Sequence, residues 1–321
     1  MRFKAGVVIS MGLVFLNLVA PTCLIAEGVA GKDTGNKRMT MTQAVLLGAV
    51  EGLTEYLPVS STGHLLVAER LMGLEKESTS PTLDDKRSKT AADAYTICIQ
   101  AGAILAVVWL YFGRIKQIGR GILGQDREGL VMMINVVAAF LPAAIVGLLF
   151  NNAIKTHLFG IWPVISAWFL GGLAILVVVH FNGGSGKSMR AGRTLDQLRI
   201  KMALIIGFVQ CIAMWPGVSR SLVTIVGGIL VGLSLPAAVE FSFLLGLLTL
   251  GAATGYDFLK HGQLMLQTFD GLSLLIGLLS GFLFAVFSIK WMVGYLSRHS
   301  LAIFGYYRVL AAIAGAALLL T

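Results

Sequence analysis

The sequence alternates long apolar runs with short polar ones, and the apolar runs have the length of membrane-crossing helices. Six of them approach the roughly 20 residues that a bilayer crossing needs. They lie near residues 94–112, 130–150, 159–181, 237–258, 272–293 and 302–320. This pattern predicts an all-α integral membrane protein, a polytopic helical bundle.

Polar stretches divide the chain further. An apolar run reaches residue 26 after a basic start, which fits either a cleaved signal peptide or an uncleaved anchor, and residues 27–41 are typical of a linker. We therefore expect an N-terminal extension over residues 1–40 and a membrane domain over residues 41–321. The mixed charges of residues 75–89 predict a solvated loop.

Two apolar segments are interrupted by polar residues, and the first is EGLTEYLPVSSTGH, residues 51–64. On a helix ending near Leu57, Glu51 and Glu55 fall on one face. Two like charges there repel unless a cation, an arginine or a shared proton lies between them. Pro58 then ends the helix. The glutamates are candidates for a divalent-cation site or a general base, and a purely structural carboxylate pair is the alternative.

Hydroxyls and an imidazole follow this proline. They belong to Ser60, Ser61, Thr62 and His64. The hydroxyls lie where a second helix begins, and a helix N-terminus with free N–H groups binds anions. Ser61 and His64 are three residues apart and share a face, as a nucleophile and its acid or base do. A plain helix cap for Ser61 and a structural role for His64 are the alternatives.

The second interrupted segment, QCIAMWPGVSRSLVT, is a degenerate copy of the first. An ungapped alignment of residues 48–62 with residues 207–221 superposes the two hydroxyl clusters. The copy supplies an amide, a guanidinium and hydroxyls, from Gln210, Ser219, Arg220, Ser221 and Thr224. Broken segments in corresponding parts of two halves indicate a binding site between inverted repeats. We predict two re-entrant helix hairpins, in repeats of about 41–150 and 200–321.

Arg220 indicates what such a site would bind. A guanidinium inside an apolar segment costs about 2.5 kcal/mol or more at the bilayer centre unless an anion compensates it. Its planar fork suits phosphate oxygens. Together with the hydroxyls it predicts a site for a phosphate or diphosphate headgroup. The alternative is an internal ion pair with Glu51 or Glu55.

Composition excludes other classes of protein. With 56% hydrophobic residues, 13% charged residues and a mean hydropathy of +0.83, the chain is not an ordinary soluble domain. The net charge of +9 fits cytoplasmic loops better than nucleic-acid binding, which we do not expect. If the hairpins do not cross the membrane, most basic residues share one side, which should be cytoplasmic. They are Arg114, Lys116, Arg120, Arg127, Lys187, Arg190, Arg193, Arg199, Lys201 and Arg298.

The two motifs, EGLTEYLPVSSTGH and PGVSRSLVT, closely resemble the signature regions of the bacterial undecaprenyl-diphosphate phosphatase family, of the bacitracin-resistance type. The resemblance runs from about residue 41 to the C-terminus and includes the FSFLLG segment. It implies a multi-pass enzyme of the bacterial inner membrane that dephosphorylates undecaprenyl diphosphate on the periplasmic side. The product, undecaprenyl phosphate, is the lipid carrier of cell-wall synthesis.

The resemblance also implies roles for residues. Catalytic roles fall on Glu51, Glu55, Ser61, His64 and Arg220. Substrate-binding roles fall on Arg220, with Ser60, Ser219 and Thr224 in support. The motif residues themselves add Thr62, Ser221 and Gln210 as substrate-binding candidates. A divalent cation, Mg²⁺ or Ca²⁺, is expected at Glu51 and Glu55, and Asp196 is a weaker match to a family acid. A transporter or flippase of an anionic prenyl-phosphate lipid is the alternative function, and a homodimer is left open.

Overall fold

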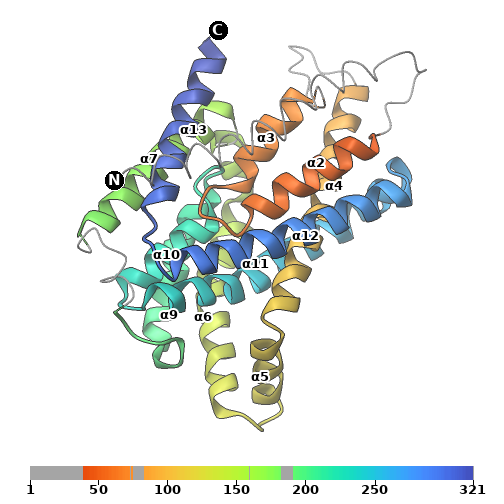
Figure 1. Cartoon of the computed structure of the whole chain (residues 1–321). Coiled ribbons are helices and arrows are strands. Elements are labelled where there is room, and N and C mark those ends of the chain that lie inside the picture. The colour runs from red at the N-terminus through yellow and green to blue at the C-terminus, as the bar shows by residue number, and fades with distance from the viewer. Residues whose placement is uncertain (1–38, 73, 75–82, 159, 182–190, 321) are drawn as a thin grey trace.

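The computed structural model describes residues 39–320, apart from 73, 75–82, 159 and 182–190. The predicted signal or anchor segment therefore lies outside the described residues. The described part is helical throughout, with one isolated bridge between Arg193 and Leu233 (Figure 1). Its α-helices are α2 (Met41–Thr54), α3 (Ser61–Leu71), α4 (Leu83–Leu110), α5 (Phe112–Ile122), α6 (Arg127–Leu158), α7 (Ile161–Phe181), α9 (Ile200–Gln210), α10 (Arg220–Leu230), α11 (Leu235–Thr268), α12 (Gly271–Leu296) and α13 (Ala302–Leu320). Two short 3-10 turns, η1 (Leu195–Gln197) and η2 (Cys211–Met214), flank α9.

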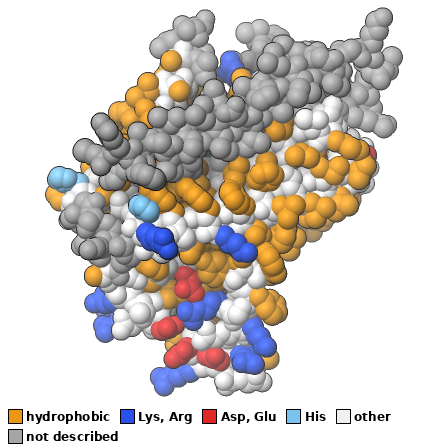
Figure 2. Space-filling model, in the orientation of Figure 1, with side chains coloured by type: hydrophobic (Ala, Val, Ile, Leu, Met, Phe, Trp, Pro, Cys, Tyr) orange, Lys and Arg blue, Asp and Glu red, His pale blue; other side chains and the backbone are white. Residues whose placement is uncertain are grey.

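Four of these helices are long and apolar enough to cross a membrane within the described residues: α6, α7, α11 and α12. A fifth span results if α4 and α5 are counted together, although they meet at a bend of 79°. The chain is thus an all-helical, multi-pass membrane protein, as its hydropathy predicts. Its surface carries many exposed hydrophobic side chains, as expected of a face toward lipid (Figure 2). Leu148 and Leu259 are among the most exposed of the large apolar residues.

The structure differs from the predicted pattern at the start of α4. Residues 83–89, which we assigned to a loop because they are charged, form the first turns of α4. Acidic residues at the start of this segment and basic residues three or four positions later are favourable in a helix. The charge composition therefore did not distinguish a helix from a loop.

Both motif segments are helices interrupted at the same place. Ser60 precedes α3 and Ser219 precedes α10, and both have a φ of 75°, which non-glycine residues rarely adopt. α3 and α10 each contain 11 residues. They also end alike, with φ and ψ of −83° and 1° at Met72 and −82° and 2° at Val231. The sequence alignment of the two motifs therefore corresponds to a repeated backbone conformation.

The helix before each break packs on a distant helix through an equivalent glycine. Gly48 of α2 lies against α12, where a Cβ would come within 2.5 Å of the Gly277 carbonyl oxygen. Gly207 of α9 lies against α6, where a Cβ would overlap the Ala139 carbonyl. Small residues at helix contacts let backbones approach closely, which is how helices pack in a bilayer.

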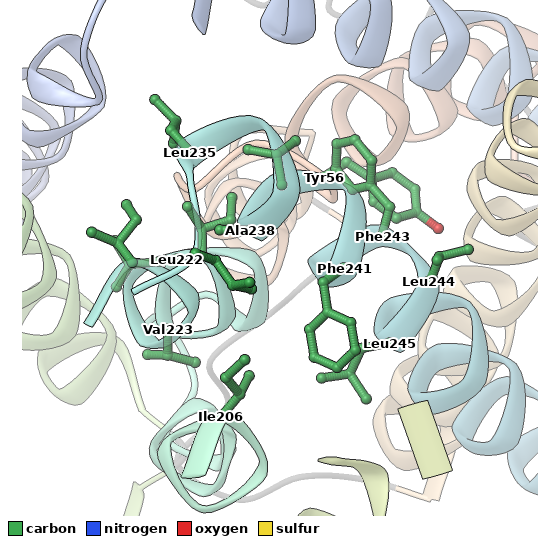
Figure 3. Packing of buried hydrophobic residues seen from close by; sticks show 14 of the residues in the cluster. Tyr56, Ile206, Leu222, Val223, Leu235, Ala238, Phe241, Phe243, Leu244 and Leu245 are labelled. Atoms are coloured by element: carbon green, nitrogen blue, oxygen red, sulfur yellow. The ribbon is translucent and has the colours of Figure 1, made fainter. Parts of the chain in front are cut away.

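A buried apolar cluster holds the two breaks beside α11. Tyr56, from the first break, meets Phe243 edge-on with ring centroids 5.4 Å apart. Figure 3 shows these rings near Phe241 of α11, with Leu222 of α10 farther along the same cluster and Ile206 of α9 below it. Because Tyr56 and Phe241 are completely buried, the site beside them rests on a closely packed support.

Charged residues gather at one end of the molecule, near the turn between α5 and α6 (Figures 1 and 2). Arg114 of α5 donates to Glu240 of α11 at 2.6 Å and lies 3.5 Å from Asp196 of η1. These contacts bring the basic segments around residues 114–127 and 193–199 to a common end.

Candidate active site

The two breaks in the helices face each other. Ser221 Oγ, from the second motif, donates to the backbone carbonyl of Leu57 in the first at 2.8 Å. Arg220 Nη2 lies 3.4 Å from Glu55 Oε1. Two segments more than 150 residues apart in sequence thus form one polar site inside the apolar bundle.

Arg220 is held in place by neighbours from three directions. Its Nη1 donates to the Ser242 carbonyl of α11 at 2.9 Å, and its guanidinium lies 5.7 Å from the centre of the Tyr56 ring. Its Nε has no hydrogen-bond partner among the described residues. The side chain is 9% exposed, so this guanidinium is positioned and has donor capacity left for a ligand.

The backbone of α11 leaves room for Arg220 at a glycine. A Cβ at Gly246 would overlap Nη1 of the guanidinium. We expect Gly246→Ala to displace Arg220 and to lower kcat/KM for phosphate release about tenfold to a hundredfold. Gly251→Ala is the matched control, because a Cβ at Gly251 on the same helix meets nothing within 4 Å. Equal activity of the two variants would show that the position of Arg220 does not matter.

Ser61 and Glu55 form the shortest polar contact of the site. Ser61 Oγ donates to Glu55 Oε2 at 2.5 Å, while the other oxygen of the same carboxylate faces Arg220. Ser61 is half-buried and begins α3, whereas the neighbouring Thr62 is exposed. The Ser61 hydroxyl therefore has a carboxylate acceptor for its proton and a side open to a ligand.

His64 has partners other than the predicted Ser61. Its Nδ1 lies 2.6 Å from the Ser60 carbonyl oxygen and its Nε2 lies 2.7 Å from the Tyr307 hydroxyl. Because a carbonyl only accepts, Nδ1 carries hydrogen, and in the neutral ring Nε2 accepts from Tyr307. The imidazole also packs on Trp168, with ring centroids 4.8 Å apart. His64 thus supports the backbone at Ser60 in this geometry, and the acceptor beside Ser61 is Glu55.

Glu51 lies one helical turn from Glu55 and is almost completely buried, with 1% exposure. Neither of its carboxylate oxygens has a hydrogen-bond partner in the described part of the chain. No group of three or more His, Cys, Asp or Glu side chains suited to a metal occurs there either. Mg²⁺ commonly binds one or two carboxylates and completes its shell with water and phosphate oxygens. The two bare oxygens of Glu51, beside Glu55, fit such an ion.

Most polar groups of the second motif are used within the protein. Ser219 accepts from the Leu222 N–H at 3.3 Å and lies 3.0 Å from Ser221 Oγ. Thr224 Oγ1 bonds to the Arg220 carbonyl at 2.8 Å and to Ser242 Oγ at 2.6 Å. These hydroxyls hold the helix start that carries Arg220.

Gln210, which aligns with Glu51, has hydrogen-bonding capacity left on its side-chain amide. Its Oε1 accepts from Thr249 at 3.4 Å, and its buried Nε2 has no partner among the residues described. Asp196 lies away from these groups, in η1, where it faces Arg114. The structure thus brings together Glu55, Ser61 and Arg220, and it leaves Asp196 at the charged end.

Two residues that the sequence analysis did not select belong to the site, Tyr307 and Arg308 of α13. Tyr307 contacts His64, and Arg308 is the largest fully buried side chain in the described part. A charged residue within the apolar run 302–320 was the available signal, because such residues are costly in a membrane and usually functional.

Comparisons with known proteins agree with this geometry. Residues 44–314 match the family model described as "Bacitracin resistance protein BacA". A relative from Sorangium cellulosum named "Undecaprenyl-diphosphatase" is 44% identical over 267 residues, covering 83% of this chain and 82% of the relative. "Undecaprenyl-diphosphatase 2" from Rhodospirillum rubrum is 41% identical over 267 residues, 83% of this chain and 90% of the relative. "Undecaprenyl-diphosphatase" from Nitrosomonas europaea is 41% identical over 272 residues, 84% and 92% of the two chains. The chain therefore belongs to the BacA family of bacitracin resistance proteins.

Proposed function

We propose that this protein is an undecaprenyl-diphosphatase, which hydrolyses undecaprenyl diphosphate to undecaprenyl phosphate and inorganic phosphate. The observation that carries the proposal is the Glu55 carboxylate, which accepts from the Ser61 hydroxyl at 2.5 Å and faces Arg220 at 3.4 Å. Glu55 thus contacts both the hydroxyl that we propose as the nucleophile and the guanidinium that we propose as the phosphate-binding fork. The names of the relatives supply the substrate class.

The reaction needs two displacements at the terminal phosphorus. Ser61 Oγ forms a bond to that phosphorus while its proton passes to Glu55. The bond to the bridging oxygen breaks, and undecaprenyl phosphate leaves with the electron pair. Water then attacks the phosphorus of the phosphoserine, the bond between phosphorus and Ser61 Oγ breaks, and Glu55 returns its proton to Ser61 Oγ as inorganic phosphate leaves with both protons of the water. Arg220 and the N–H groups at the start of α3 stabilise the charge on the equatorial oxygens.

A divalent cation, Mg²⁺ or Ca²⁺, would be held by Glu51 with Glu55 nearby. The support is the buried Glu51 carboxylate without partners. When bound, such an ion supplies positive charge to neutralise diphosphate oxygens. His64 contributes by fixing the Ser60 carbonyl, and through it the backbone that begins α3.

We also infer that the fold consists of two inverted repeats whose first elements are re-entrant hairpins. One support is the backbone conformation that recurs at Ser60 and Ser219. The other is that the motif helix of each repeat packs on a helix of the other repeat, α2 on α12 and α9 on α6. The repeats correspond to about 41–150 and 200–321. The charged end near Arg114 then faces the cytoplasm, and the site opens toward the periplasm of the inner membrane. Recycling of the lipid carrier on that side would account for the role in bacitracin resistance.

The proposed function is tested by measuring inorganic phosphate released from undecaprenyl diphosphate by the detergent-purified protein. We expect release that is abolished by EDTA and restored by excess Mg²⁺ or Ca²⁺, because an ion at Glu51 neutralises the diphosphate. Activity that persists unchanged in EDTA would refute the proposed requirement for a divalent cation, but it would still support the hydrolase. Absence of any phosphate release, with movement of the lipid between leaflets of vesicles, would favour the flippase alternative.

A further inference from the structure

Arg308 of α13 is a buried cation whose partners are all backbone carbonyls. Its side chain is 1% exposed, and α13 packs along α7 (Figure 1). Its Nη2 donates to the carbonyls of Ala167 and Gly217, both at 2.8 Å. Its Nε and Nη1 donate to those of Trp168 and Pro58 at 3.3 and 3.4 Å. One guanidinium thus connects α7 with both breaks of the site.

The two break carbonyls occupy equivalent positions in the repeat. Pro58 lies two residues before Ser60, and Gly217 lies two residues before Ser219. Ser60 and Ser219 have the same unusual φ, and each is followed by the residue that acts on phosphate, Ser61 or Arg220. Arg308 therefore donates hydrogen bonds to equivalent backbone carbonyls in the two copies of the motif.

The arrangement is not explained by charge neutralisation. No carboxylate forms an ion pair with Arg308 among the residues that the structure describes. An isolated buried charge is costly, and here only hydrogen bonds to neutral carbonyls offset that cost. Gly171 of α7 leaves room for the Arg308 guanidinium, because a Cβ at this position would overlap Nη2 of Arg308. A site that needed only packing would be served by an apolar side chain.

We infer that Arg308 is a positioning residue that sets the distance between the nucleophile and the phosphate-binding arginine. It fixes the Ser61 break relative to the Arg220 break through carbonyls of both. A lysine cannot replace it, because three donors on one nitrogen cannot reach carbonyls on three segments as a planar fork does. This inference rests on the proposed hydrolase, since it assigns Arg308 a task in that reaction.

The test is the kinetics of Arg308→Lys with undecaprenyl diphosphate. We expect kcat to fall about a hundredfold, because displacement of reacting groups by about 1 Å has that effect. KM should change less than about threefold, because Arg220, which we propose binds the substrate phosphates, remains. Arg120→Lys is the matched control, since Arg120 is exposed on α5, and it should behave as the unaltered protein.

Two further measurements separate positioning from stability. In Arg308→Ala, added guanidinium should restore kcat in a saturable way, whereas equal concentrations of sodium chloride should not. Gly171→Ala, which crowds the guanidinium but retains it, should lower kcat with little change in KM, and Gly294→Ala should not, because a Cβ at Gly294 meets nothing within 4 Å.

The outcomes are distinguishable from those of the proposed function. Inactive unaltered protein would refute the hydrolase itself. If the unaltered protein is active and a folded Arg308→Lys or Gly171→Ala variant has the same kcat, the positioning role is overturned. A lowered melting temperature in detergent with normal kcat, or failure of every variant to fold, would make Arg308 a purely structural residue and overturn the inference as well.

Discussion

Ser61→Ala is expected to lower kcat for phosphate release by about a thousandfold or more, which corresponds to about 4 kcal/mol of transition-state stabilisation. Ser61 Oγ is the hydroxyl that touches the Glu55 carboxylate, and it is partly accessible at the start of α3. Its removal takes away both the attacking oxygen and the proton that Glu55 accepts. KM should change little, because the groups proposed to bind diphosphate remain.

The measurement is single-turnover phosphate release, accompanied by trapping of ³²P from substrate labelled at the terminal phosphate. The unaltered protein should carry the label on Ser61 when quenched early, and Ser61→Ala should carry none. Ser297→Ala is the control, because Ser297 is exposed at the end of α12 and its hydroxyl donates to the nearby Gly294 carbonyl. Near-normal turnover by Ser61→Ala would instead establish direct attack by water.

The polar motifs predicted where the helices break, because the signals for a helix end and a helix start are local. A proline after two glutamates marks a helix end, and hydroxyls after it mark a helix start. The ungapped repeat then indicated that Arg220 belongs with the first motif, and the structure places it at Glu55. Apolar run length likewise predicted α6, α7, α11 and α12 as membrane-crossing helices.

Long-range geometry was not accessible from the same signals. The spacing of Ser61 and His64 did not reveal that the imidazole Nδ1 lies 2.6 Å from the Ser60 carbonyl oxygen. The second partner, Tyr307, is 243 residues away in sequence. The contact of Arg308 with Pro58 spans 250 residues, and no local pattern encodes such a separation.

The last apolar run forms one helix with the predicted bounds, α13 (Ala302–Leu320). Length alone was insufficient at α4. α4 extends N-terminally beyond the predicted 94–112 and is followed by a bend of 79° into α5. Charges such as Arg114 follow that bend and pair with Glu240, so the chain turns where its apolar run ends.

Arg220→Lys is expected to weaken substrate binding and to lower kcat/KM about a thousandfold, as removal of an arginine does in other phosphoryl transfers. The guanidinium already donates to the Ser242 carbonyl and to Glu55, and its fork can still donate to two phosphate oxygens. A lysine ammonium is a point charge with three donors. It could keep the Glu55 contact, but it could not hold two phosphate oxygens at the same time.

That difference separates a phosphate clamp from an internal ion pair. Binding is measured with Ser61→Ala, which keeps the substrate intact, with and without Arg220→Lys. If Arg220 binds diphosphate, the added lysine should weaken affinity at least about tenfold, the equivalent of one lost charge-assisted hydrogen bond. Arg298→Lys, an exposed control beyond α12, should leave affinity unchanged. Full affinity with lysine at 220 would mean that the residue only neutralises Glu55, because a single positive charge suffices for that.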